Sequence, residues 1–250
     1  MEATIILSLA DEHATLITVG GKGASLAKLV NAGLPVPDGF HITTTAYQQF
    51  VAENALQPRI LAALRDVDVA QPAHLEAASD QIRALFIGAP IPSNIAGAIR
   101  AAYLSLSAAP ISVAIRSSAT AEDLPDASFA GQQDTYLNIQ GVDAVLDAVR
   151  RCWSSLWTAR AIGYRMRRGI DPDTVSLAVV VQQLILAEAA GILFTANPLN
   201  GRREQLVINA AWGLGEAIVG GLVTPDTYTV AKTTGRLLNC EVADKQVMTI

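Results

Sequence analysis

The stretch Ile111-Ser112-Val113-Ala114-Ile115-Arg116, followed by a loop from Ser117 to Gly131, sets the fold class of this chain. It comes directly after Pro110, which ends a helical region. The apolar residues of 111–115 predict a short buried strand with Arg116 at its carboxyl end. A buried guanidinium needs a carboxylate or a phosphate as its partner. Both alternatives are open here, since Glu122 and Asp123 follow in the loop.

The loop at 117–131 consists of small and acidic residues without periodicity. A loop of this length inside a compact domain is unusual and is more often functional. Its small side chains would let the backbone approach a polyphosphate, and Gly131 can adopt conformations that other residues avoid. Thr135 lies four residues further on and could donate a hydroxyl. The alternative is an ordinary surface loop.

Helical and strand periodicities divide the chain on either side of this stretch. Residues 60–106 and 142–157 have helical spacing, whereas strands are predicted at 135–139, 177–185, 192–196, 206–210, 228–231 and 237–242. We therefore expect an α/β or α+β protein with a helix-rich lobe at 1–110 and a strand-rich lobe at 111–250. The two lobes together would form one domain. The hydrophobic share of 51% and charged share of 16% exclude a disordered chain.

Charge and cysteine content limit the classes of partner and the compartment. The net charge of −5 argues against a nucleic-acid-binding surface. Cys152 and Cys240 form no metal-binding or disulfide pattern, which fits a reducing cytoplasm. The apolar segment 175–195 is interrupted by Gln182 and Glu188, so two buried strands joined by a short turn explain it better than a membrane span. We expect a cytoplasmic protein that binds neither nucleic acid nor membrane.

A glycine-rich segment, Gly20-Gly21-Lys22-Gly23, precedes a run with helical spacing. Free amides and one ammonium at a helix N-terminus favour an anion. The spacing is not that of a Walker A loop. A glycine turn with an exposed lysine is the plain alternative. Convergence of Lys22 on Arg116 would favour a phosphate as the partner of that arginine.

Three polar residues in the strand-rich part are further candidates. Gln182 and Gln183 interrupt an apolar strand, and a buried amide there would suit an adenine edge or neighbouring backbone. Glu216 begins a short helical stretch and could be a metal ligand or a docking group. A solvated glutamate at a helix start is the more common outcome. The three histidines share no motif.

Five segments in this order resemble the ATP-binding N-terminal domain of the pyruvate phosphate dikinase and phosphoenolpyruvate synthase family. The resemblance spans nearly the whole chain, from about residue 16 to 230, and rifampin phosphotransferase shares the same domain. The segments are Val19-Gly20-Gly21-Lys22-Gly23-Ala24-Ser25-Leu26, Pro35-Val36-Pro37-Asp38-Gly39-Phe40, the stretch from Ala114 through Gln132, Gly191-Ile192-Leu193-Phe194-Thr195-Ala196-Asn197-Pro198, and Trp212-Gly213-Leu214-Gly215-Glu216.

The resemblance implies an ATP-grasp-like fold that holds ATP and Mg²⁺ between two lobes. Lys22 and Arg116 would bind the phosphates and serve catalysis, with loop contacts from Gly131 and Thr135. Gln182 would face the adenine, and Gln183 is counted with it among the cofactor-binding residues. In the family, the β-phosphate of ATP passes to a histidine on a separate swivelling domain, which carries it to an acceptor-binding domain.

Two family features have no counterpart in this sequence. The family's Mg²⁺-binding glutamate and Gln-x-Arg would lie beyond Ile250, and the Gly-Gly-x-x-Ser-His segment with the phosphohistidine is missing. We therefore expect a domain that is truncated at its C-terminus and inactive alone. The leading hypothesis is the ATP domain of a pyruvate, water dikinase. The alternatives are a rifampin phosphotransferase-like enzyme and a non-catalytic nucleotide-binding fragment.

Overall fold

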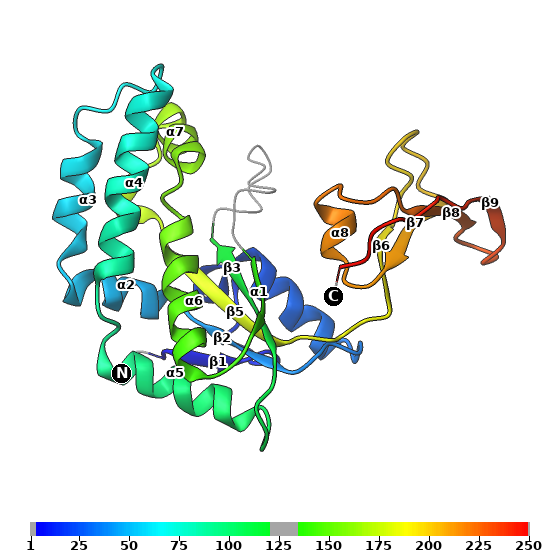
Figure 1. The fold of residues 1–250 in the computed structure, drawn as a ribbon, viewed down its shortest axis with the longest axis horizontal. Helices are drawn as coiled ribbons and strands as arrows, with labels where there is room; N and C mark the ends of the chain where they lie inside the picture. The colour runs from blue at the N-terminus through cyan, green and yellow to red at the C-terminus, as the bar shows by residue number, and fades with distance from the viewer. Residues whose placement is uncertain (1–3, 121–134, 250) are drawn as a thin grey trace. The chain divides into compact units, whose positions relative to one another are not determined.

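The computed structural model describes residues 4–120 and 135–249, which form two compact units, Met1–Leu184 and Ile185–Ile250 (Figure 1). The first unit continues well past residue 110 because strand β5 (Leu177–Gln183) lies between β2 (Gly39–Ile42) and β3 (Val113–Ala119). That insertion joins segments from both sides of residue 110 in one sheet. The division into lobes at 1–110 and 111–250 stays a prediction about the ATP-binding domain.

The first unit combines one sheet with helices on both of its faces. Its other strands are β1 (Ile6–Ser8) and β4 (Thr135–Ile139). Its helices are α1 (Leu16–Asn31), α2 (Thr44–Glu53), α3 (Leu56–Leu64), α4 (Pro72–Gly88), α5 (Ser93–Ser105), α6 (Val142–Ser155) and α7 (Ala159–Arg168), with a 3₁₀ turn at Pro172–Thr174.

The five strands run in the order β1-β2-β5-β3-β4, and every neighbouring pair is antiparallel. Successive side chains along a strand alternate between the two faces. One face carries Ile42, Ile115 and Val179, which belong to the main hydrophobic core with residues of α2 to α7. Stacked and tilted rings of Tyr47, Phe50, Phe86 and Trp153 fill its centre. Helix α1 packs against β5 and β3 on the other face.

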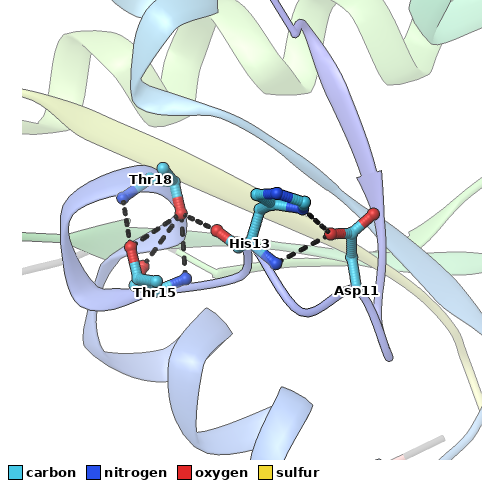
Figure 2. A network of polar contacts seen from close by, with 4 residues as sticks. All are labelled: Asp11, His13, Thr15 and Thr18. Carbon is cyan, nitrogen blue, oxygen red and sulfur yellow. Dashed lines mark hydrogen bonds and ion pairs between the residues drawn. The ribbon is translucent and has the colours of Figure 1, made fainter.

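Helix α1 begins at a polar network that is shown in Figure 2. The Thr18 amide donates to the Thr15 hydroxyl and the Thr15 amide donates to the Thr18 hydroxyl, which forms a capping box. Beside it, the Asp11 carboxylate accepts from the backbone and ring nitrogens of His13 at 2.8 and 3.0 Å. These bonds lower the pKa of Asp11. The Thr18 hydroxyl bonds to the His13 carbonyl and not to its ring, so this network is a helix start and not a nucleophilic triad.

The second unit contains a four-stranded antiparallel sheet in the order β6-β7-β8-β9. Its elements are β6 (Ala189–Phe194), β7 (Gln205–Trp212), the short helix α8 (Glu216–Val219), β8 (Asp226–Ala231) and β9 (Leu237–Glu241). The predicted strands at 192–196 and 206–210 are confirmed as neighbours, because β6 pairs with β7. The prediction of two buried strands within 175–195 is wrong for the second strand, because β6 is largely exposed and starts another sheet.

Mixed helix and strand content is confirmed, and the antiparallel sheets make the chain an α+β protein. Within the described residues, no single helix is long and apolar enough to cross a membrane. Helices α4 and α5, which meet at a bend of 77°, reach that length and composition only as a pair.

Candidate functional site

A row of five side chains crosses the sheet of the first unit on the face next to α1. The strand registers pair Leu7 with His41, His41 with Val180, Val180 with Arg116, and Arg116 with Thr135. Directly opposite residues of neighbouring strands project to the same face with their Cβ atoms about 5 Å apart. The row therefore places the guanidinium-bearing residue and the exposed threonine side by side.

Arg116 is the fourth of seven residues in β3 and not the last residue of its strand. The expectation of a strand that ends at Ile115 is wrong, because Ser117 and Ser118 continue the ladder opposite Val179 and Ala178 of β5. Arg116 is half-buried there. The two loop carboxylates that were its alternative partners lie outside the described residues.

Thr135 begins β4, and its side chain is exposed. The predicted strand at 135–139 is confirmed with the same bounds. Its neighbour Tyr136 pairs with Ile115 and so lies on the opposite face, where the Arg151 guanidinium of α6 is 6.0 Å from the ring. The loop residue Gly131 lies outside the described part of the chain.

The two adjacent glutamines of β5 lie on different faces of the sheet. Gln182 pairs with Ala114 and Gly39, one row along from Arg116 on the same face. It is buried, and its amide donates to the Pro37 carbonyl at 3.1 Å. The backbone partner that we weighed for this glutamine is therefore present. The amide has a second N–H and an acceptor oxygen, so one bond leaves capacity for a ligand.

Gln183 pairs with Val113 and is exposed on the other face, so the structure does not bring it to the row with Arg116. Its backbone amide donates to the Asp38 carbonyl at 2.7 Å. The turn at 35–40 is therefore tied to β5 through both glutamines. The approach at Gly39 is very close, because a Cβ there would lie 2.3 Å from the Val181 carbonyl oxygen.

The glycine-rich segment lies inside α1 and not before it. The helix starts at Leu16 and is kinked at Gly20, whose φ of 70° and ψ of 179° are not helical. The kink makes a second helical start, so the expected helix N-terminus at the glycines exists within the longer helix. Lys22 is half-buried two residues after the kink. A left-handed φ is readily adopted only by glycine.

Ser118 joins this kink to β3. Its hydroxyl accepts from the Gly23 amide at 3.1 Å and donates to the Val19 carbonyl at 2.7 Å. A Cβ at Gly20 would lie 2.2 Å from the Ser118 carbonyl oxygen. The glycine segment and the strand that carries Arg116 are thus in direct contact.

His41 lies fully buried in the row, beneath the second helical start of α1. A Cβ at Gly23 would be 3.2 Å from its Nδ1 atom. Among the residues that the structure describes, neither ring nitrogen makes a hydrogen bond of normal geometry. Burial lowers the pKa of His41 from 6.5 to about 4, against smaller opposing effects of the Leu9 backbone and the Asp11 carboxylate. His41 is therefore neutral near pH 7.

Ser118 and His41 were not among the residues that the sequence singled out. His41 sits within a short apolar run, where a polar residue on the inner face of a strand is the available signal, whereas Ser118 sits among small residues at the end of β3. The alternation of apolar and polar residues along a strand would not by itself have distinguished these two residues from polar core residues whose hydrogen bonds are all satisfied. Their importance follows from what lies above the sheet, which is the kinked helix.

Glu216 is exposed at the first residue of α8 in the second unit. Within the described residues, no group of three or more His, Cys, Asp or Glu side chains could hold a metal ion. The described donor set therefore does not fit Mg²⁺ by itself. It fits an anion better, because Arg116 and the hydroxyl-bearing Thr135 lie side by side on one face of the sheet.

Comparison with known proteins gives a consistent picture. The family described as the pyruvate phosphate dikinase AMP/ATP-binding domain matches residues 16–250. The chain is 48% identical over 233 residues to a probable phosphoenolpyruvate synthase of Methanothermobacter thermautotrophicus, and 50% identical over 233 residues to one of Methanocaldococcus jannaschii. It is 44% identical over 269 aligned positions to the phosphoenolpyruvate synthase of Pyrococcus furiosus.

These alignments cover 92 to 93% of the chain but only 34%, 20% and 33% of the three relatives. The chain thus spans about a third or less of the curated relatives it matches.

Proposed function

Because the chain belongs to the family of the pyruvate phosphate dikinase AMP/ATP-binding domain, we propose that it holds ATP on the face of the five-stranded sheet that carries Arg116. The observation that carries this proposal is the register of β3, β4 and β5. It aligns Arg116 with Thr135 and places Gln182 one row away on the same face. Helix α1, with Lys22 after its kink, crosses that face.

The chemistry of these residues suits the two ends of a nucleotide. Arg116 and Lys22 would neutralise the phosphates, and the Thr135 hydroxyl would donate to a phosphate oxygen. A planar guanidinium binds phosphate through two parallel bonds, whereas an ammonium acts as a point charge. Gln182 offers an amide to the adenine edge. The roles of Gly131 and Gln183 stay predictions, and Gln183 is the weaker one since it lies on the other face.

The whole protein is proposed to be a phosphoenolpyruvate synthase-like phosphotransferase of the pyruvate, water dikinase type. The three relatives are called phosphoenolpyruvate synthase or probable phosphoenolpyruvate synthase, and each is about three times the length of the chain or longer. We propose an ATP-grasp-like arrangement, a phosphohistidine domain and an acceptor domain as further parts of it. A rifamycin-type acceptor and a non-catalytic role remain the alternatives. We also propose that Mg²⁺ accompanies ATP and that the protein works in the cytoplasm.

The residues described here would bind and orient the polyphosphate, and the rows on either side of Arg116 would exclude water from it. Ala114 in the neighbouring row and Val180 in the row of Arg116 itself supply apolar surface, and both are buried. No transfer step is assigned to a residue of this chain.

Isothermal titration of the chain with ATP, with and without Mg²⁺, tests the proposal. Binding of ATP, and weaker binding of adenosine without phosphates, is the expected result. Failure of ATP to bind at millimolar concentration would contradict it. Titration with pyruvate and with a rifamycin, neither of which should bind, checks that acceptor recognition is not a property of this domain.

A further inference from the structure

At the kink in α1, a side chain of β3 bonds to two backbone groups that a regular helix would pair with each other. In a regular α-helix the amide of Gly23 would donate to the carbonyl of Val19, four residues earlier. Here the Ser118 hydroxyl stands between them, since it accepts from Gly23 at 3.1 Å and donates to Val19 at 2.7 Å. A side chain inserted into the helical ladder is a known cause of a sharp kink.

The groups that form these two hydrogen bonds are buried, so the loss of the bonds would be costly. Val19, Gly23 and Ser118 are all buried. If the hydroxyl were removed, a buried donor and a buried acceptor would both lose their partner, which is costly. The Gly23 amide could then donate directly to the Val19 carbonyl. That bond requires Gly20 to change from its φ of 70° to a helical conformation.

Straightening would change the direction of the helix immediately before Lys22. Lys22 precedes Gly23 by one residue, and Arg116 precedes Ser118 by two residues on the same face of β3. The hydroxyl therefore joins the segment that carries one cationic residue to the strand that carries the other. Gly20 leaves room for this contact, because a Cβ there would lie 2.5 Å from the Ser118 hydroxyl oxygen.

We propose that Ser118 is a positioning residue of the nucleotide site: its hydroxyl maintains the kink of α1 and so sets the place of Lys22 relative to Arg116. The role of Ser118 in ATP binding rests on the proposed function. The control of the kink does not rest on it.

Backbone chemical shifts of isotope-labelled protein test the structural half. In Ser118→Ala the Gly20 carbon shifts should move toward those of a helical glycine. The matched control is Ser155→Ala, which also removes a buried hydroxyl, one that donates to the Cys152 carbonyl at 2.7 Å within α6. It should leave Gly20 unchanged. An unaltered Gly20 in folded Ser118→Ala would overturn the proposal.

Ser118→Cys guards against a variant that fails to fold. A thiol is somewhat larger than a hydroxyl, so it leaves no cavity, but it is a weak hydrogen-bonding group. It should move the Gly20 shifts in the same direction as the alanine variant, and unchanged shifts in this variant would again overturn the proposal.

A double-mutant cycle on ATP affinity tests the positioning half. Ser118→Ala should weaken ATP binding about tenfold, or about 1.4 kcal/mol. In a Lys22→Ala background its effect should fall below about twofold, because coupled residues are not additive. Ser155→Ala should have no effect in either background. If Ser118→Ala weakens ATP binding as much in the Lys22→Ala background as in the wild type, Ser118 has a merely structural role and the proposal is overturned.

The two failures can be told apart. If the wild-type chain does not bind ATP, the proposed function fails and the nucleotide role of Ser118 fails with it. The Gly20 shifts would still decide whether Ser118 maintains the kink.

Discussion

The amide of Gly23 donates to the hydroxyl of Ser118 at 3.1 Å, although 95 residues separate them in the chain. This bond brings the glycine segment of α1 against the strand that carries Arg116. Two sequence motifs that are far apart thereby become parts of one surface. The surface is the face of the sheet opposite the main hydrophobic core.

Removal of either proposed phosphate-binding cation should weaken ATP binding. Lys22→Ala and Arg116→Ala should each raise the Kd by about ten- to hundredfold, because a hydrogen bond to a charged group contributes about 1.5–3 kcal/mol. Titration calorimetry measures the change. Lys28→Ala, two turns along α1, and Arg151→Ala, on the opposite face of the sheet, are the controls. Equal affinity in all four variants would contradict the site.

The two glutamines of β5 should behave differently. Gln182→Ala should destabilise the protein by about 1–3 kcal/mol in urea unfolding, since the Pro37 carbonyl loses its donor. It should also weaken ATP binding more than tripolyphosphate binding if its amide faces the adenine. Gln183→Ala should be nearly neutral, because its side chain is exposed on the other face. Equal effects at both positions would rule out the predicted orientation.

Acid should destabilise the fold through His41. Its pKa is 6.5 in the unfolded chain and about 4 in the fold, so the unfolded state binds more protons between these values. The stability it contributes is complete above pH 6.5 and is lost as the pH falls toward 4, by at most about 3 kcal/mol.

Urea unfolding of the wild type and His41→Leu at about pH 7.5 and about pH 4.5 measures this loss. The variant should lose less stability on acidification than the wild type. His74→Leu is the control, because His74 is exposed on α4 and should leave the difference unchanged. The Asp11 carboxylate titrates in both proteins, and its pKa is lowered mainly by hydrogen bonds from His13 and only least by the charge of His41, so its contribution largely cancels in the comparison. Equal pH dependence of wild type and His41→Leu would exclude His41 as the cause.

Replacement of Gly20 should cause both backbone strain and a steric clash, whereas replacement of Gly33 should cause backbone strain alone. Both have a left-handed φ, of 70° and 74°. Gly33→Ala should cost about 1–2 kcal/mol from backbone strain alone, since nothing lies within 4 Å of the added Cβ. Gly20→Ala should cost clearly more, because its Cβ would meet the Ser118 carbonyl oxygen at 2.2 Å. Thermal unfolding ranks the two, and equal melting temperatures would refute the close contact.

Local pattern was sufficient for elements that bury one face against the core. The strand at 135–139 and the helix that begins at Val142 follow the prediction, because period-two and helical spacing are properties of neighbouring residues. The extension of β3 through Ser118 was not predictable in this way. Two serines and an alanine have low strand propensity, and they pair only because β5 supplies a ladder.

The sequence by itself determined the family and the mixed helix-and-strand content, and it named Lys22, Arg116, Thr135 and Gln182 as site candidates. These follow from motifs and from residue chemistry, which do not depend on distant contacts. Only the tertiary structure decided that Gln183 lies on the other face, that α1 is kinked, and that Ser118 and His41 lie beneath it. The physical reason is strand pairing, since the register between β5 and its neighbours assigns each side chain to a face.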